Sequence, residues 1–303
     1  MAKKSFQGTA TALVTPFKSD GALDEKALRN LVDFQITEGI DMILPCGTTG
    51  EGATLEAAET DRVLQIVLEQ ARGRVPVIMG AGSNSTAKAV AGAKRAKQLG
   101  AAAVLSVGPY YNKPTQQGFY EHFKAVAGAE NIPIIVYNVP GRTGSNIEAR
   151  TMLGLAEIPN VAAVKEASGN LGQIMDIIRD RPPDFRVLSG DDAFAVPIIA
   201  MGGDGVISVA SNAAPRAMRD IVDAALEGNL AKARDLHYQL LPLMNANFIE
   251  SNPIPVKAVL TMMGLIEENY RLPLVRMNPA NREKLAKVVE ECPSIHHETL
   301  RRN

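Results

Sequence analysis

The sequence predicts an α/β protein, specifically a (β/α)8 TIM barrel with a C-terminal helical appendage. Eight short apolar runs alternate with amphipathic stretches over the first three quarters of the chain. The runs are apolar throughout instead of alternating with polar residues, which is typical of parallel strands covered on both faces. A doubly wound open sheet is the alternative, and periodicity alone does not exclude it.

Each predicted strand is four to six residues long, and most are rich in Val or Ile. Their positions in chain order are residues 10–15, 42–45, 75–80, 102–107, 132–137, 161–165, 186–189 and 205–209.

The stretches between the runs carry apolar residues at helical spacing. Asp24 can cap the first helix, which ends at Gly39. One apolar face is visible in each of four stretches: Leu28, Leu31, Val32 and Ile36; Val63, Val67 and Ala71; Leu171, Ile174 and Ile178; Met218, Ile221, Val222 and Ala225.

The strand signals stop near Asn229. Residues 230–248, 255–263 and 281–291 have helical patterns. We therefore expect a barrel that carries the active site over residues 1–228 and a C-terminal helical region over residues 229–303. This region could be a small appendage or an oligomer contact.

The composition indicates a cytoplasmic protein. The formal net charge of −1 gives no attraction to nucleic acid or to an anionic membrane, and no apolar run approaches the roughly 20 residues of a membrane span. Two cysteines form no disulfide framework and suit a reducing compartment. Cys292, His296 and His297 could hold a stray metal ion, but we interpret them as part of a frayed tail and expect no metal site.

Two candidate catalytic residues end neighbouring predicted strands. Active sites of such barrels lie at the carboxyl ends of the strands, where Tyr137 and Lys165 stand as last residues. A lysine at a strand end more often reaches water. However, adjacent strands lie about 4.8 Å apart, so that the phenol and the amine could act on one substrate.

An amine in a small apolar mouth has a lowered pKa and can attack a ketone to form a Schiff base. The phenol is a reasonable proton shuttle. The loop with Thr48 and Thr49 can cradle a carboxylate with its free N–H groups, and Arg142 can bind a second one. Taken singly, the loop could be a plain turn, Tyr110-Tyr111 interface packing and Arg142 a surface ion pair. Together, at consecutive strand ends, they favour function.

Four motifs resemble those of one enzyme family, and they occur in the same order across residues 8–272. They are Gly47-Thr48-Thr49-Gly50-Glu51, Tyr110-Tyr111-Asn112-Lys113-Pro114, Tyr137-Asn138-Val139-Pro140-Gly141-Arg142-Thr143-Gly144 and Val164-Lys165-Glu166-Ala167. This set is similar to the signatures of the dihydrodipicolinate synthase and N-acetylneuraminate lyase family.

The resemblance implies a class I aldolase, usually a homotetramer (a dimer of dimers), that holds pyruvate on Lys165 as a Schiff base without metal or organic cofactor. Thr48, Tyr111 and Tyr137 would form the proton relay, with Tyr111 entering the site of the neighbouring subunit. Thr49 would help to hold the pyruvate carboxylate. Gly190 and Ile207 would line the pocket through their backbone.

Two features of this resemblance bear on the second substrate. Synthases of the family carry an arginine at the position of Arg142, where it binds the carboxylate of L-aspartate 4-semialdehyde, and the lyases tend to read GSTGE in place of GTTGE. Both features favour the synthase reaction of diaminopimelate and lysine biosynthesis. The alternatives are related aldolases acting on 2-keto-3-deoxy sugar acids, 4-hydroxy-2-oxoglutarate or N-acetylneuraminate, and a non-catalytic keto-acid-binding barrel.

The resemblance also bears on feedback by lysine. Inhibited members bind lysine at an interface, and Ala53, Leu55, Asn84 and Tyr110 fit their pattern here. Ala57 and Thr60 replace histidines of strongly inhibited enzymes, and Lys88 replaces a glutamate. A like charge facing the ammonium of the effector penalises binding. We therefore expect weak inhibition by lysine or none.

Overall fold

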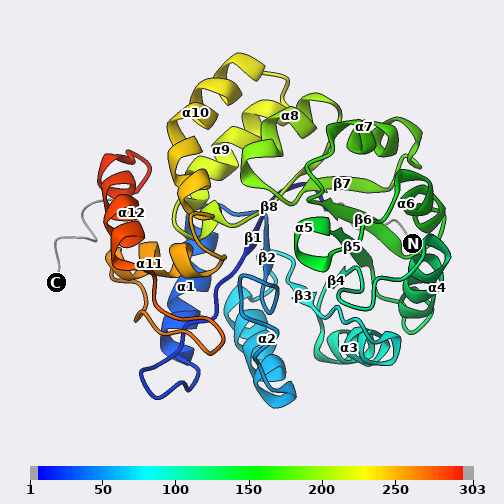
Figure 1. The fold of residues 1–303 in the computed structure, drawn as a ribbon, viewed down its shortest axis with the longest axis horizontal. Coiled ribbons are helices and arrows are strands. Elements are labelled where there is room, and N and C mark those ends of the chain that lie inside the picture. The colour runs from blue at the N-terminus through cyan, green and yellow to red at the C-terminus, as the bar shows by residue number, and fades with distance from the viewer. Residues whose placement is uncertain (1–5, 296–303) are drawn as a thin grey trace.

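Eight parallel strands form the barrel predicted from the sequence, with helices around it (Figure 1). The computed structural model describes residues 6–295. Neighbouring strands follow the order β2-β1-β8-β7-β6-β5-β4-β3. The strands are β1 Gly8–Ala12, β2 Met42–Leu44, β3 Ile78–Gly80, β4 Ala103–Val107, β5 Ile134–Asn138, β6 Val161–Glu166, β7 Arg186–Ser189 and β8 Gly205–Ser208.

The barrel closes between β2 and β3 through a short contact. Ile43 and Val77 form a single parallel bridge, and the amide of Ile43 donates to the carbonyl of Pro76 at 3.1 Å. The amide of Gly80 donates to the carbonyl of Pro45 at 3.0 Å. Because β1 pairs with β8 as well as β2, the doubly wound alternative is wrong.

Some strand limits differ from those expected. The first strand ends at Ala12 and not at residue 15, and β3 and β5 begin at Ile78 and Ile134, after Pro76 and Pro133. A proline has no N–H to donate to the ladder, which accounts for the late start of both strands. Tyr137 and Lys165 are each followed by one further strand residue.

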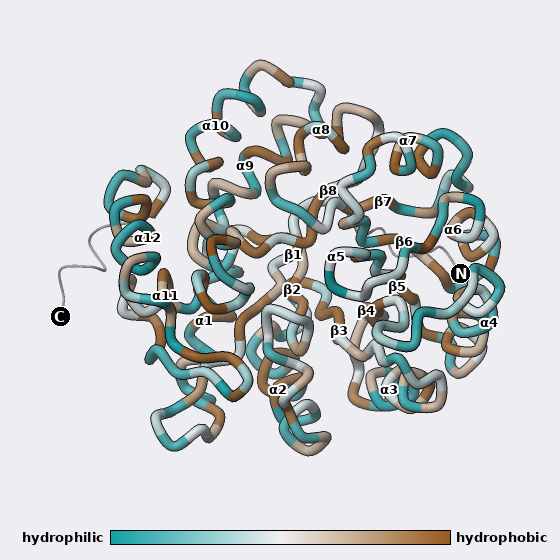
Figure 2. Tube along the Cα trace, viewed as in Figure 1, coloured by the Kyte–Doolittle hydropathy of each residue, from teal (hydrophilic) through white to brown (hydrophobic). Residues whose placement is uncertain are grey.

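The strands separate two apolar cores. In Figure 2, hydrophobic segments, coloured brown, run through the strands at the centre of the molecule. Val136, Val164 and Val187 belong to the core that includes the surrounding helices. Ala12, Leu44, Leu105, Ile135, Ala163, Leu188 and Ile207 belong to the smaller inner core. Successive strand residues point to opposite faces, so the strand register places Tyr137 and Lys165 on the inner side.

The helices that surround the strands include the ones expected from apolar spacing. Asp24 caps α1 by accepting a hydrogen bond from the amide of Ala27 at 3.0 Å, as predicted. A short α5 and a separate α6, which the sequence pattern did not indicate, follow β5. The bounds are α1 Glu25–Thr37, α2 Ala57–Ala71, α3 Thr86–Leu99, α4 Gln116–Ala127, α5 Pro140–Thr143, α6 Ala149–Ala156, α7 Leu171–Asp180, α8 Ala195–Ala200 and α9 Pro215–Leu226.

Three further helices follow the barrel and lie to one side of it (Figure 1). They are α10 Leu230–Ala246, α11 Ile254–Met262 and α12 Pro279–Glu291, which confirms the three expected helices. The division at residue 228 stays a prediction, and His296 and His297 lie outside the described residues. Within residues 6–295, no helix combines the length and the apolar character that a membrane crossing needs.

Candidate active site

Lys165 and Tyr137 face each other at the carboxyl end of the barrel. The two residues are direct partners in the β5–β6 register. Nζ of Lys165 lies 4.5 Å from the centroid of the Tyr137 ring. Both side chains are buried, with exposed fractions of 6% and 7%. The sequence predicted that these two groups lie close together on neighbouring strands, and the structure confirms this proximity.

Burial changes the protonation of both groups. It lowers the pKa of Lys165 to about 8 because an ammonium loses its hydration there, and the nearby carboxylate of Asp192 only partly opposes this shift. Burial also raises the pKa of Tyr137 to about 12. Near neutral pH the site therefore holds a protonated phenol beside an amine that loses its proton unusually easily.

A narrow cavity brings six of the eight predicted site residues together. Its lining includes Thr48, Thr49, Tyr137, Arg142, Lys165 and Gly190. A Cβ atom at Gly190 would lie 2.7 Å from Cβ of Ala167 and 3.1 Å from both Cγ and Cε of Lys165, so glycine leaves room for the lysine chain here. The apolar remainder of the lining comes from Ala12, Leu44, Leu105, Val209 and Phe248.

The other two predicted site residues, Tyr111 and Ile207, do not line this cavity. Tyr111 has 88% of its surface exposed and a φ of 69°, and it does not line the cavity. Ile207 is fully buried in the inner core but is likewise not part of the cavity wall.

The loop after β2 has a constrained backbone. Cys46 and Glu51 have φ values of 60° and 52°, a region that non-glycine residues rarely adopt. Within the loop, the amide of Glu51 donates to the carbonyl of Thr48 at 3.1 Å. The hydroxyl of Thr15 donates to the carbonyl of Gly50 at 2.7 Å. These bonds fix the position of Thr48 and Thr49 at the cavity mouth.

Asn252 is a cavity residue that the sequence reasoning missed. Its side-chain amide donates to the hydroxyl of Thr49 at 2.9 Å, and its carbonyl accepts from Arg142 at 3.5 Å. Its own Oδ1 is buried and has no hydrogen-bond partner. The residue lies between α10 and α11, in a segment for which the sequence predicted neither a strand nor a helix. The only signal there was the pair of prolines at 253 and 255.

A buried carboxylate, that of Glu166, follows Lys165 at the end of β6. The carboxylate of Glu166 accepts from the side-chain Nδ2 of Asn138 at both oxygens, at 3.2 and 3.1 Å, and from the backbone amide of Ser168 at 2.8 Å. Asn138 and Glu166 are register partners directly after Tyr137 and Lys165. The contact therefore pins the ends of both strands, and sequence reasoning missed this role too.

A larger and more open depression of about 630 Å³ lies between the segment before α1 and the turn after α11. Its lining includes four charged residues, Asp24, Glu267, Glu268 and Arg276, but no lysine and no tyrosine. The amine of Lys165 and the phenol of Tyr137 lie in the smaller cavity, which makes it the candidate active site. In the described part of the chain, no three His, Cys, Asp or Glu side chains are grouped as a metal site requires.

Comparison with known proteins identifies the family. The family model described as the dihydrodipicolinate synthetase family matches residues 5–292, nearly the whole chain. The chain belongs to the dihydrodipicolinate synthetase family. This membership confirms the resemblance seen in the four sequence motifs.

Individual members of the dihydrodipicolinate synthetase family are similar over nearly their full length. The 4-hydroxy-tetrahydrodipicolinate synthase of Koribacter versatilis is 56% identical over 97% of this chain and 98% of its own. The crystal structure of dihydrodipicolinate synthase from Aquifex aeolicus has a TM-score of 0.93 and 48% identity, covering 94% of this chain and 98% of its own. A chloride-inhibited dihydrodipicolinate synthase from Acinetobacter baumannii, complexed with pyruvate, has a TM-score of 0.94 and 43% identity, covering 96% and 100%.

Proposed function

We propose that the protein is a 4-hydroxy-tetrahydrodipicolinate synthase, a lyase that condenses pyruvate with L-aspartate 4-semialdehyde. The observation that carries this proposal is the buried amine of Lys165, 4.5 Å from the Tyr137 ring in a cavity that Arg142 also lines. The relatives named above bear this activity in their names. The reaction belongs to diaminopimelate and lysine biosynthesis.

The reaction begins at Lys165. Its neutral amine attacks the ketone carbon of pyruvate, and the resulting carbinolamine loses water to form an iminium. The positive nitrogen then draws electrons from the neighbouring C–H bond, so that the methyl carbon loses a proton and an enamine forms. The lowered pKa of Lys165 makes the first attack possible near neutral pH.

We assign proton transfer to Tyr137 and Thr48, with Tyr111 supplied by a neighbouring subunit. The ring of Tyr137 lies 4.5 Å from the amine, and its raised pKa keeps the phenol protonated. Thr49 would help to hold the pyruvate carboxylate, and Gly190 leaves space beside Lys165. A backbone role of Ile207 stays a prediction.

The second substrate would be bound by Arg142. The enamine carbon attacks the aldehyde carbon, and the new alkoxide takes up a proton. The amino group of the bound semialdehyde then attacks the iminium carbon and displaces Lys165, which closes the ring and frees the enzyme. The guanidinium of Arg142 is suited to hold the carboxylate of the semialdehyde during both steps.

We further propose that the protein works as a cytoplasmic homotetramer, a dimer of dimers. Exposed apolar side chains, including Tyr110, Tyr111, Leu171 and Met175, support an interface between subunits. The two buried cysteines are free, which suits a reducing compartment.

The test is a coupled assay with both substrates that follows consumption of the product by its reductase. The wild-type protein should turn over, and Lys165→Ala should not. Borohydride should trap pyruvate on the wild-type protein only. A wild-type protein that traps pyruvate but does not turn over the semialdehyde would favour a related aldolase with another acceptor. Binding without trapping would favour the non-catalytic barrel.

A further inference from the structure

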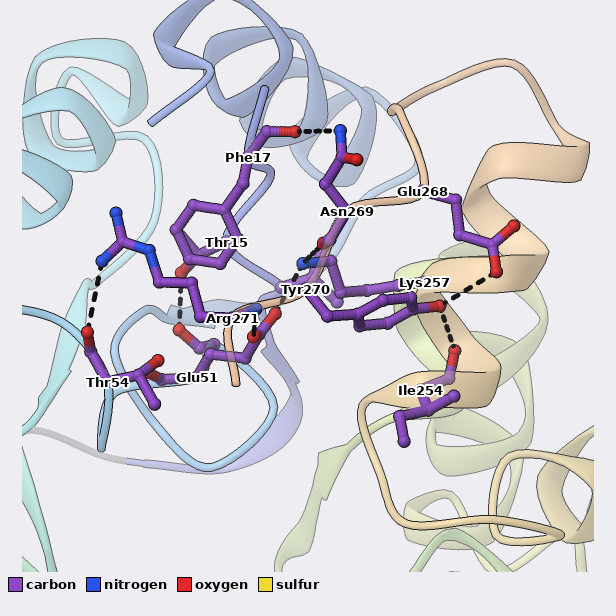
Figure 3. A network of polar contacts seen from close by, with 12 residues as sticks. Thr15, Phe17, Glu51, Thr54, Ile254, Lys257, Glu268, Asn269, Tyr270 and Arg271 are labelled. Atoms are coloured by element: carbon purple, nitrogen blue, oxygen red, sulfur yellow. Dashed lines mark hydrogen bonds and ion pairs between the residues drawn. The ribbon is translucent and has the colours of Figure 1, made fainter. Parts of the chain in front are cut away.

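A second buried lysine joins the C-terminal helices to the active-site loop (Figure 3). Nζ of Lys257, on α11, lies 2.5 Å from Oε1 of Glu51, the last residue of the Gly47–Glu51 loop motif. The two side chains are 0% and 1% exposed. The ammonium also donates to the carbonyl of Asn269 at 2.6 Å. The ion pair therefore ties three distant chain segments together.

Two aromatic rings enclose the same ammonium. Nζ of Lys257 lies 4.5 Å from the ring centroid of Phe17 and 5.1 Å from that of Tyr270. The hydroxyl of Tyr270 donates to the carbonyl of Ile254 at 2.9 Å, which fixes the orientation of its ring. These contacts hold the ammonium in place, with its hydrogen bonds directed at the carboxylate and a carbonyl.

Stability alone is a weak reason for such a pair. The desolvation of two buried charges often offsets their attraction, and well-packed apolar residues of similar volume commonly serve as well. What the pair does supply is a fixed position for Glu51. The second carboxylate oxygen of Glu51 accepts from the backbone amide of Arg271 at 3.2 Å, so this carboxylate is held at both oxygens.

The backbone passes this constraint on to the catalytic threonines. The amide of Glu51 bonds to Thr48, and the amide of Gly52 donates to the carbonyl of Gly47 at 3.1 Å. A Cβ atom at Gly52 would lie 2.2 Å from the carbonyl oxygen of Cys46, so the loop is closely packed on itself. A displacement of Glu51 would move Thr48 and Thr49 with it.

We propose that Lys257 is a positioning residue for the proposed reaction: through Glu51 it holds the Thr48–Thr49 loop in its reactive geometry against Lys165. The C-terminal region is then a working part of the active site. Asn252, in the same region, provides a separate bond to Thr49. The kinetic test of this inference rests on the proposed function. A second test, hydrogen–deuterium exchange of the loop, does not depend on that function.

The kinetic test is a double-mutant cycle between Lys257→Met and Thr48→Val. Misplacement of a reacting group by about 1 Å can cost on the order of 100-fold, so we expect each single variant to lose about that much of kcat/KM for pyruvate. If Lys257 acts through Thr48, the double variant should be no more than a few-fold worse than the worse single variant. Losses that multiply would overturn the inference.

A second variant covers the case in which Lys257→Met does not fold. Glu51→Gln keeps the side-chain volume and one hydrogen bond to Lys257 but removes the charge. We expect about a tenfold loss of kcat/KM and the same non-additivity with Thr48→Val. The matched control is Glu25→Gln, which breaks the 2.6 Å ion pair between Glu25 on α1 and Arg62 on α2, away from the contacts of Glu51. It should keep kcat/KM unchanged.

Hydrogen–deuterium exchange gives the readout that does not depend on activity. Exchange over residues 47–52 should rise in Lys257→Met or Glu51→Gln and stay at the wild-type level in Glu25→Gln. Unchanged exchange in the first two variants would overturn the inference, whatever the enzyme catalyses. Failure of the wild-type protein to trap pyruvate would instead overturn the proposed function and leave the exchange test in force.

Discussion

Lys165 and Tyr137 are paired residue for residue across β5 and β6, and the lysine Nζ lies 4.5 Å from the centre of the tyrosine ring. The pairing follows from strand register alone, because both residues point into the barrel from adjacent strands. The same burial that brings the two groups together shifts both pKa values, downward for the amine and upward for the phenol. This one relationship supports the roles proposed for Lys165 as nucleophile and for Tyr137 in proton transfer.

The first prediction concerns pH. Because the pKa of Lys165 is lowered to about 8, only about one tenth of the amine is neutral at pH 7. We expect kcat/KM for pyruvate to rise about tenfold per pH unit below this pKa and to level off above it. The measurement is a pH profile of kcat/KM for pyruvate.

A variant at Asp192 tests the cause of this pH profile. The carboxylate of Asp192 raises the pKa of Lys165 against the effect of burial. Asp192→Asn should therefore move the midpoint of the profile to lower pH. A midpoint near 10.5 for the wild-type protein, the ordinary pKa of lysine, would contradict the proposal that burial lowers the pKa of Lys165.

The second prediction concerns the hydroxyl of Tyr137. Tyr137→Phe keeps the ring and removes the group that transfers a proton. General acid–base catalysis commonly contributes 100-fold or more, so we expect kcat to fall by about 100-fold or more. Steady-state kinetics measure this loss. Tyr238→Phe, at an exposed tyrosine of α10, is the control and should leave kcat unchanged. A small effect of Tyr137→Phe on kcat would show that other residues transfer the proton.

The third prediction separates the two substrates. Arg142→Ala should raise KM for aspartate semialdehyde by about 10- to 100-fold, the range expected from a charged hydrogen bond. Borohydride trapping of pyruvate on Lys165 should persist. Arg150→Ala, at an exposed arginine on α6 that does not line the cavity, is the matched control. Equal losses for both substrates would show that Arg142 serves the pocket as a whole.

The sequence predicted those parts of the site that depend on local order. Strand ends, glycine-rich loops and the residues that follow them are adjacent in the chain, so the barrel rule predicted that Lys165, Tyr137 and the Thr48–Thr49 loop lie at one end of the barrel, and in the structure they line one cavity. Asn252 and Lys257 reach this loop from more than 200 positions away. No periodicity or motif near either residue indicates that contact, because tertiary packing of the C-terminal helices on the barrel creates it.

The existence of the strands was predictable from the sequence, but some of their limits were not. Apolar runs identified all eight strands, but Pro76 and Pro133 delayed two of them since neither residue can donate to the ladder. The φ values near +60° at Cys46 and Tyr111 were also not predictable. They are imposed by contacts of the folded loops and not by the residue types.

The fourth prediction concerns inhibition by lysine. The positions that resemble an effector site include Tyr110, which is 40% exposed, and Asn84, whose carbonyl accepts from Asn112 at 2.9 Å. Lys88, on the exposed face of α3, places a positive charge where the effector ammonium would need a negative one. We therefore expect less than a twofold loss of activity at about 1 mM lysine, because exposed like charges repel by roughly 1 kcal/mol at contact distance in water.

A charge-reversed variant tests the cause of this insensitivity. Lys88→Glu should make the protein measurably more sensitive to lysine, and adding Ala57→His and Thr60→His should increase the sensitivity further. Lys97→Glu, at another exposed lysine of α3, is the control for a general change of surface charge and should leave the response as in the wild type. Strong inhibition of the wild-type protein at sub-millimolar lysine would contradict the prediction. It would mean that the remaining positions, Ala53, Leu55, Asn84 and Tyr110, suffice to bind the effector without a facing carboxylate.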